Sequence, residues 1–313
     1  MASRSAMQRL DPKNMVCRFL GNTGLKVSVL SFGSWCRYKT ARDCMQEAWD
    51  QGVNDFHTAE VYALGDSRTD LVISTKLFWG GSSSNDTGLA KKHPFEGMNA
   101  SLQRLGLDYV DVVMAHRPDR KTPMEEIVRA FTQIVNSGGA LLIPPVCDQP
   151  QYNMFWRQRV EGELSPVLAS YRYGLTIWSP LDNAVLTGKY NEGIPADSRF
   201  AATSAAALDK ENMINFGMTL SSTEGQTKIE KVRRLTLIAR ELRCTTAQLL
   251  AWCLLDETVS TVITGASQPA QVTKNMKVLD VYRKIKSMPE VIGRIEEILG
   301  NRLAEPELWG RWN

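Results

Sequence analysis

The sequence lacks the features that define several large classes of protein. Its 37 lysines and arginines stand against 34 acidic residues and form no basic run, which excludes the electrostatic footprint of a nucleic-acid-binding or membrane-surface protein. Its six cysteines form no C-x-x-C pair, so we expect neither a zinc site nor a disulfide scaffold but reduced thiols inside the core. These absences predict a small-molecule partner, no nucleic acid and no metal.

Long apolar runs are also missing. The N-terminal segment MASRSAMQRLDPKN contains no apolar stretch of the kind found in a signal peptide. The most apolar stretch, from Leu249 to Ala266, is interrupted by Asp256 and Glu257 and is too short and too charged to cross a bilayer. We therefore expect a cytoplasmic location without membrane insertion.

What the chain does contain is an alternation of strand-like and helical periods. Its 313 residues are 43% hydrophobic and 23% charged, enough for one large barrel or two average domains. The strands are expected at 27–34, 53–59, 71–76, 110–116, 140–143, 146–152, 175–180 and 259–267. Helical periods are expected at 43–51, 94–105, 123–135 and, in at least two pieces, 228–255. The turn formers Gly21, Asn22 and Gly24 predict a hairpin at about 17–28 ahead of these elements.

Helix-length segments between strands that are apolar on both faces predict parallel β-α units. Such units build either a (β/α)₈ barrel or a doubly wound sheet, and the lack of G-x-G-x-x-G after a strand counts against the sheet. Two crossovers are too short for a packed helix: residues 60–70, rich in Gly, Asp, Ser and Thr, and the pair Pro144-Pro145. We predict an α/β fold of TIM-barrel type, incomplete after strands 2 and 5, with six outer helices.

Polar side chains follow the expected strands at the ends where a barrel builds its active site. His57 and Tyr62 follow the second strand, Lys76 ends the third, His116 ends the fourth and Gln149 lies in the sixth. An ammonium lowers the pKa of a nearby phenol, the phenol donates a proton to a forming alkoxide, and a neutral imidazole orients the carbonyl oxygen. This combination suits carbonyl reduction by a hydride that a cofactor must supply.

Six segments carry motifs in a fixed order along the chain. They are FHTAEVY (56–62), DLVISTK (70–76), DYVDVVMAHRPD (108–119), QPQYN (149–153), WSPLDNAVLTGKY (178–190) and ITGAS (263–267). From about Phe19 to Arg302 the chain resembles the aldo-keto reductases, particularly the branch that contains potassium-channel β-subunits and their fungal and plant enzyme relatives. The resemblance implies a (β/α)₈ barrel that binds NADPH in extended form, without a Rossmann motif, and reduces aldehydes or ketones.

The same resemblance assigns the catalytic set. It makes Tyr62 the proton donor, Lys76 the residue that tunes it and His116 the carbonyl-orienting residue, which channel subunits lack. His57 belongs to this set because it stands where the family has an aspartate that pairs with the lysine. An imidazole cannot supply that negative charge. Asp55, two residues earlier on the same face of the strand, is the alternative carboxylate.

Cofactor contacts are implied in the same way. Gln149 resembles the residue that holds the nicotinamide carboxamide, and Trp178 the ring that stacks on the nicotinamide. The other residues assigned to NADP(H) are Ser34, Trp35, Ser179, Pro180, Leu181, Lys189, Ser198, Arg199, Gly265, Ser267, Gln271 and Asn275. The preference for NADPH over NADH rests on the family alone.

The chain departs from the family pattern at several places. The helix after the catalytic tyrosine is missing, and so are the short motif and the helix after the fifth strand. Asp182-Asn183-Ala184 stands where the family has Ala-Ser/Cys-Gly, and Lys274 replaces an acidic residue near the adenine. We attribute these gaps to gene degeneration, alternative splicing or an incorrect gene model, and expect lowered activity.

The prediction is thus a single barrel domain over 1–313, with a C-terminal helix and tail at about 289–313. It acts as an NADPH-dependent reductase of an aldehyde or ketone, in fungal-type secondary metabolism. Trp35, Phe78 and Trp79 suggest an aromatic-lined mouth. One alternative is a catalytically inactive NADPH-binding regulatory subunit that resembles a channel β-subunit, and another is a degenerate chain that does not fold. The oligomeric state stays open, with a homo-oligomer among the alternatives.

Overall fold

The structure is a computed structural model that describes residues 15–33, 38–57, 71–80, 85–142, 146–196, 198 and 220–303. Contacts within the chain divide it into two compact units. Unit 1 comprises Met1–Gln149, Val167–Thr176 and Thr258–Met276, and unit 2 comprises Pro150–Pro166, Ile177–Glu257 and Lys277–Asn313.

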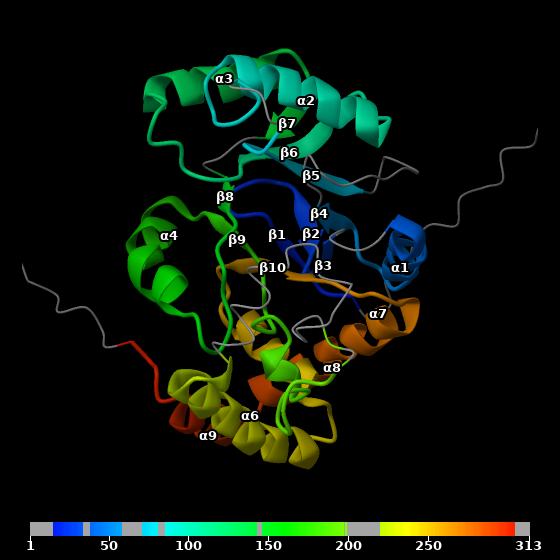
Figure 1. Cartoon of the computed structure of the whole chain (residues 1–313), viewed down its shortest axis with the longest axis vertical. Coiled ribbons are helices and arrows are strands. Elements are labelled where there is room, and N and C mark those ends of the chain that lie inside the picture. The colour runs from blue at the N-terminus through cyan, green and yellow to red at the C-terminus, as the bar shows by residue number, and fades with distance from the viewer. Residues whose placement is uncertain are drawn as a thin grey trace, which may run out of the picture. The chain divides into compact units, whose positions relative to one another are not determined.

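Unit 1 is built on an eight-stranded sheet (Figure 1). Its strands are β3 (Leu30–Gly33), β4 (Asp55–His57), β5 (Val72–Leu77), β6 (Val110–Ala115), β7 (Ala140–Leu142), β8 (Cys147–Asp148), β9 (Gly174–Ile177) and β10 (Val259–Thr264). Most of their residues are buried, because both faces of a parallel sheet are covered. All eight strands expected from the sequence are confirmed.

The sheet forms an incomplete barrel. Its strand order is β7-β6-β5-β4-β3-β10-β9-β8, so β7 and β8 are the two edges and no described residue pairs one with the other. Only 143–146 separate these edge strands in the chain, too few for the dozen residues that a parallel crossover needs. The opening therefore lies at one of the two crossovers that the sequence marked as too short, whereas the other, residues 60–70, lies outside the described residues.

Six strands are followed along the chain by a helix among the described residues, as predicted. These helices are α1 (Tyr38–Asp50), α2 (Lys92–Leu105), α3 (Met124–Asn136), α4 (Ser165–Tyr171), α6 (Thr223–Glu241) and α7 (Pro269–Met276). The ends of α2 and α3 follow sequence signals: Gly106 caps α2 in the left-handed conformation, and Glu125 and Glu126 lie in the first turn of α3, where the helix dipole favours acidic side chains.

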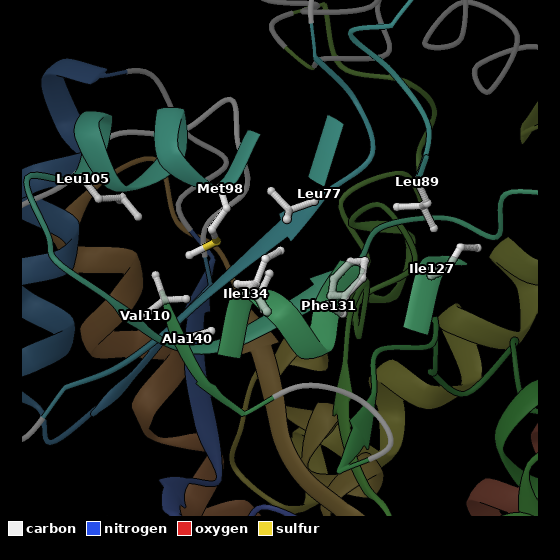
Figure 2. Close-up of a cluster of buried hydrophobic side chains, with 10 residues drawn as sticks. Leu77, Leu89, Met98, Leu105, Val110, Ile127, Phe131, Ile134 and Ala140 are labelled. Carbon is white, nitrogen blue, oxygen red and sulfur yellow. The ribbon is translucent and has the colours of Figure 1, made fainter. Parts of the chain in front are cut away.

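Helices α2 and α3 cover one face of the sheet at β5, β6 and β7 (Figure 1). Figure 2 shows Leu77 of β5, Met98 of α2, and Phe131 and Ile134 of α3 pointing toward one another. Because successive residues of a strand face opposite sides, burying Leu77 under the helices turns Lys76 to the other side of the sheet. We call that other side the inner face.

The predicted hairpin is confirmed, as β1 (Cys17–Phe19) paired antiparallel with β2 (Lys26–Ser28). Its turn approaches the sheet so closely that a Cβ on Gly21, which has φ +57°, would lie 2.4 Å from the carbonyl oxygen of Val146 and 2.5 Å from the nitrogen of Gly174. Glycine is therefore required there. Leu20 and Val27 of the hairpin join a buried apolar cluster that also contains Val72, Val112, Met114 and Cys147.

Several expected strands are shorter than the sequence suggested; β9 and β10, for example, end at Ile177 and Thr264. The run 27–34 is divided at Val29, so that its first part pairs within the hairpin and its second part, β3, enters the sheet. The run 146–152 keeps strand geometry only in β8, because Pro150 has no N–H for a ladder hydrogen bond.

Unit 2 is mostly helical. It contains the π-helix η1 (Gln158–Glu163), the 3₁₀ segments η2 (Val185–Thr187) and η3 (Thr246–Leu255), and the helices α6, α8 (Val278–Lys286) and α9 (Pro289–Leu299). The expected division of 228–255 into pieces is confirmed, because α6 ends at Glu241 and η3 begins with a capping box formed by Thr245 and Gln248.

Ala184 lies in a strained backbone conformation in unit 2. Asp182, Asn183 and Ala184 all have positive φ, and the value of 73° at Ala184 is unfavourable for a side chain with a Cβ. We expect Ala184→Gly to raise the free energy of unfolding by about 0.5–1 kcal/mol, because relief of strain exceeds the added entropy of the unfolded chain. Urea unfolding measures the change.

The matched control is Ala239→Gly, a buried position within the regular helix α6. Glycine there should lower the free energy of unfolding by about 1 kcal/mol or more, since helix propensity and packing are both lost. A loss of stability in Ala184→Gly would contradict the assigned strain.

Two kinds of feature are absent from the described ranges. No three or more His, Cys, Asp or Glu side chains gather there in a way that would hold a metal ion. None of the helices described in these ranges combines the length and apolar character that a membrane span requires.

Candidate active site

The inner face of the sheet carries a row of polar side chains at the carboxyl ends of β4 and β5. The pairing register places His57 beside Ser74 and Asp55 beside Val72, so Asp55, His57, Ser74 and Lys76 share this face. Asp55, His57 and Ser74 are buried. Alternation along two adjacent strands is enough to bring these four residues together.

His57 is the centre of a hydrogen-bond network. Its Nε2 lies 2.9 Å from Asp55 Oδ2, and its Nδ1 lies 2.8 Å from Ser74 Oγ and 3.1 Å from Gln149 Nε2. Gln149 Nε2 also donates to Thr176 Oγ1 at 3.0 Å. An amide nitrogen can only donate, so Nδ1 of His57 is an acceptor and the ring proton is on Nε2, which donates to Asp55.

The burial of the Lys76 ammonium disfavours its charge. Burial lowers the pKa of Lys76 from its ordinary 10.5 to about 8, and the negative charge of Asp55 opposes this fall. Asp55 therefore acts electrostatically on Lys76, although the position where the family has its aspartate is occupied by His57. The nearby thiol of Cys147 is protonated at neutral pH, since burial raises its pKa to about 12.

His116 follows the last residue of β6, and its backbone N–H donates to the Leu77 carbonyl oxygen at 3.0 Å. Burial, together with the positive charges of Lys76 and Arg117, lowers the pKa of His116 from its ordinary 6.5 to about 4. Its imidazole is thus neutral at physiological pH. The effect of Lys76 on this pKa places the two groups within electrostatic range of each other.

The low pKa of His116 predicts a pH-dependent stability. Between about pH 6.5 and pH 4 the unfolded chain binds a proton at His116 that the folded chain does not, so the free energy of unfolding falls as the pH falls through this window. We expect the wild-type protein to lose more stability than His116→Gln between about pH 7 and about pH 5. Urea unfolding at both pH values tests this, and equal losses would contradict it.

The residues assigned to the adenosine end follow β10. Gly265 and Ser267 lie in the loop, and Gln271 and Asn275 lie on α7. Gln271 Oε1 accepts from the backbone N–H of Ser267 at 2.8 Å and from its hydroxyl at 3.2 Å, so these two residues are joined.

The other described candidates belong to unit 2. Trp178 follows β9; its N–H donates to the Pro150 carbonyl at 3.1 Å, and its side chain is 38% exposed. Ser179 has a φ of 54°, and Lys189 Nζ lies 5.4 Å from the centre of the Tyr190 ring. The remaining ones are Pro180 and Ser198, which are buried, and Leu181, which is partly buried.

Four predicted site residues lie outside the described residues: Ser34, Trp35, Tyr62 and Arg199. The sequence reasoning in turn overlooked Ser74 and Thr176, which complete the network around His57 and Gln149. Each stands two residues before a residue that was assigned, Lys76 or Trp178. The period of two along a strand was the signal that would have identified both.

Comparison with known proteins places the chain among one set of relatives. Residues 30–143 and 140–299 match the sequence model of the Aldo/keto reductase family. A "Putative voltage-gated potassium channel subunit beta" of Schizosaccharomyces pombe (strain 972 / ATCC 24843) is 42% identical over 342 aligned positions, which cover 94% of this chain and 96% of that protein. A "Probable voltage-gated potassium channel subunit beta" of Arabidopsis thaliana is 41% identical, with 92% of this chain and 98% of that protein covered.

One alignment also shows that this chain lacks residues that a relative has. The 342 positions aligned with the Schizosaccharomyces pombe protein exceed the 313 residues of this chain, so part of that relative has no counterpart here. A similarly named protein of Oryza sativa subsp. japonica is 41% identical, with 90% of this chain and 96% of that protein covered. Given the family match over most of its length and relatives of this identity, the chain belongs to the aldo-keto reductase family.

Proposed function

We propose that the chain catalyses the NADPH-dependent reduction of an aldehyde or a ketone to an alcohol. The observation that supports this most is that Lys76 and His116 stand at the ends of the neighbouring strands β5 and β6. The pKa of Lys76 is about 8, and His116 is neutral. Titratable groups with strongly shifted pKa values are characteristic of sites that move protons.

In this proposal each side chain has a separate task. Bound NADPH supplies a hydride for the carbonyl carbon. Tyr62 gives its phenolic proton to the carbonyl oxygen, and the ammonium of Lys76 stabilises the phenolate that remains. A neutral His116 donates a hydrogen bond from its ring N–H to the same oxygen and so orients the carbonyl group.

The residues present fit a dinucleotide. In unit 1, no atom of the residues that the structure describes lies within 4 Å of the position that a Cβ on Gly265 would take, so the described backbone after β10 leaves room for a ligand. We propose that Gln149 holds the carboxamide of NADPH and that Ser267 and Asn275 contact its adenosine end.

Two aromatic residues that follow the end of β5 bear on the substrate. Phe78 and Trp79 pack edge to face with ring centres 4.7 Å apart, and Trp79 is half exposed. Phe78 is partly buried against the cluster under α2 and α3, so Trp79 is the exposed ring of the pair, and an exposed aromatic ring at the carboxyl end of a barrel strand favours an apolar ligand. We therefore propose that aromatic aldehydes are better substrates than short aliphatic ones.

The test uses the purified full chain with NADPH and a panel of aromatic and aliphatic aldehydes. Oxidation of NADPH is followed by the loss of its absorbance, with reactions lacking aldehyde as the control. The proposal expects aldehyde-dependent oxidation that is faster with aromatic substrates. No oxidation above the control with any member of the panel would contradict it.

A cofactor-binding subunit without catalysis is the second candidate, because the relatives named above carry the name of potassium channel subunits. Such a protein would be stabilised by NADPH through mass action, and its melting temperature would rise with NADPH concentration. It would not oxidise NADPH with any aldehyde. The presence of His116, which the family resemblance assigns to the enzymes and not to the channel subunits, favours the reductase.

A further inference from the structure

The buried pair formed by Asp55 and His57 connects two strands that are far apart in the chain. Asp55 and His57 lie on β4 and have side chains only 2% and 3% exposed, whereas their partner Gln149 follows β8. The chain of contacts runs from Asp55 Oδ2 to His57 Nε2, and from His57 Nδ1 to Gln149 Nε2. Its two distances, 2.9 Å and 3.1 Å, are ordinary hydrogen-bond lengths.

A buried carboxylate needs compensation, because removal from water strongly disfavours its charge. Asp55 has two sources of it on the inner face: the Nε2–H of His57 and the positive charge of Lys76. The acceptor Asp55 fixes the proton of His57 on Nε2, which leaves Nδ1 to accept. Asp55 thus decides the tautomer of His57.

The tautomer of His57 in turn decides the orientation of the Gln149 amide. Gln149 points its NH₂ group at two acceptors, His57 Nδ1 and Thr176 Oγ1, so both of its amide protons are engaged. A reversed amide would place its oxygen against Nδ1, and two acceptors would then face each other. The arrangement therefore leaves Gln149 with its oxygen to offer to a ligand.

We propose that Asp55 and His57 are positioning residues that hold Gln149 as a hydrogen-bond acceptor for an N–H group of the cofactor. This inference rests on the proposed function, since it takes the carboxamide of NADPH as the group that donates. In this chain Asp55 supplies the negative charge near Lys76 that an aspartate at the His57 position supplies in the family, and His57 orients Gln149 instead.

The first test needs no cofactor. Nitrogen-15 NMR of the three histidines, assigned with His93→Gln and His116→Gln, should show the ring proton of His57 on Nε2 and not on Nδ1. In Asp55→Asn the pKa of Lys76 should fall below its value of about 8, because the opposing negative charge is lost. A proton on Nδ1, or an unchanged Lys76 pKa, would overturn the pair.

The second test compares NADPH with its 3-acetylpyridine analogue, in which an acetyl group without N–H replaces the carboxamide. Fluorescence titration of the wild-type chain should give about tenfold tighter binding of NADPH, as expected for one lost hydrogen bond. His57→Phe should reduce this preference to near one, and Gln149→Leu should do the same. Tyr171→Phe, at an exposed residue of α4 outside this network, is the control and should retain the preference.

The outcomes separate the two proposals. Equal binding of both dinucleotides by the wild-type chain, or a full preference in His57→Phe, would overturn the positioning role. If the wild-type chain binds neither dinucleotide, the proposed function is wrong and the positioning role falls with it, while the NMR result still decides whether the pair exists. The wild-type measurements need no substitution, so they stand even where His57→Phe does not fold.

Discussion

Replacement of Tyr62 by phenylalanine is expected to lower kcat for aldehyde reduction by about 10²- to 10⁴-fold, the usual contribution of a positioned general acid. The phenol is the proton donor in the proposed reaction, and phenylalanine keeps the ring but has no proton to give. The affinity for NADPH should stay close to that of the wild type, because the cofactor contacts are assigned to other residues. Steady-state kinetics with an aromatic aldehyde and a separate cofactor titration measure both effects.

Tyr171→Phe is the matched control for this substitution. Tyr171 is an exposed residue at the end of α4, 62% of whose surface is accessible, and its ring stacks on Tyr173. Loss of its hydroxyl should leave kcat unchanged. An equal rate in Tyr62→Phe and the wild type would reject Tyr62 as the proton donor.

Arg157 is expected to be the most sensitive charged residue of unit 2. Its side chain is 6% exposed, its Nε donates to Glu161 at 2.8 Å, a terminal nitrogen donates to Glu296, and its guanidinium lies 5.0 Å from the centre of the Trp252 ring. Arg157→Met should lower the free energy of unfolding by about 3 kcal/mol, because it leaves two partly buried carboxylates without their cation. Urea unfolding at neutral pH measures the loss.

An arginine two residues later, in the π-helix η1, provides the comparison. Arg159 pairs with Glu163 at 2.7 Å, but both side chains are about half exposed. Arg159→Met should change the free energy of unfolding by no more than about 0.5 kcal/mol, as is usual for an exposed ion pair. Similar losses of unfolding free energy in the two variants would show that the burial of Arg157 does not make its ion pairs more stabilising than an exposed pair.

Much of the fold of unit 1 could be predicted because the relevant signals are local. Apolar runs located all eight strands, and the pair Pro144-Pro145 located the opening of the barrel, since two prolines leave no room for a crossover helix. The division of the run 27–34 could not be predicted. It follows from pairing with β1 on one side and β10 on the other, which periodicity alone does not reveal.

The candidate site was predicted in its residues but not in its connections. His57, Lys76 and Gln149 were identified from motifs, whereas the bond between His57 and Gln149 depends on how β4 and β8 approach across the sheet. The effect of Asp55 on the pKa of Lys76 is not evident from the sequence, because Asp55 lies two residues before the end of its strand and Lys76 lies near the end of the next one. Because the cluster is buried, the effective dielectric is low and the attraction between the two charges stays significant over this longer distance.

The most direct test of the account is transfer of the label from NADPH deuterated at the reactive carbon of its nicotinamide to an aromatic aldehyde. Mass spectrometry of the product decides the result. The account predicts an alcohol that carries one deuterium at the former carbonyl carbon, formed by the wild-type chain and not by Tyr62→Phe. Unlabelled alcohol, or no alcohol from a chain that binds the cofactor, would contradict it.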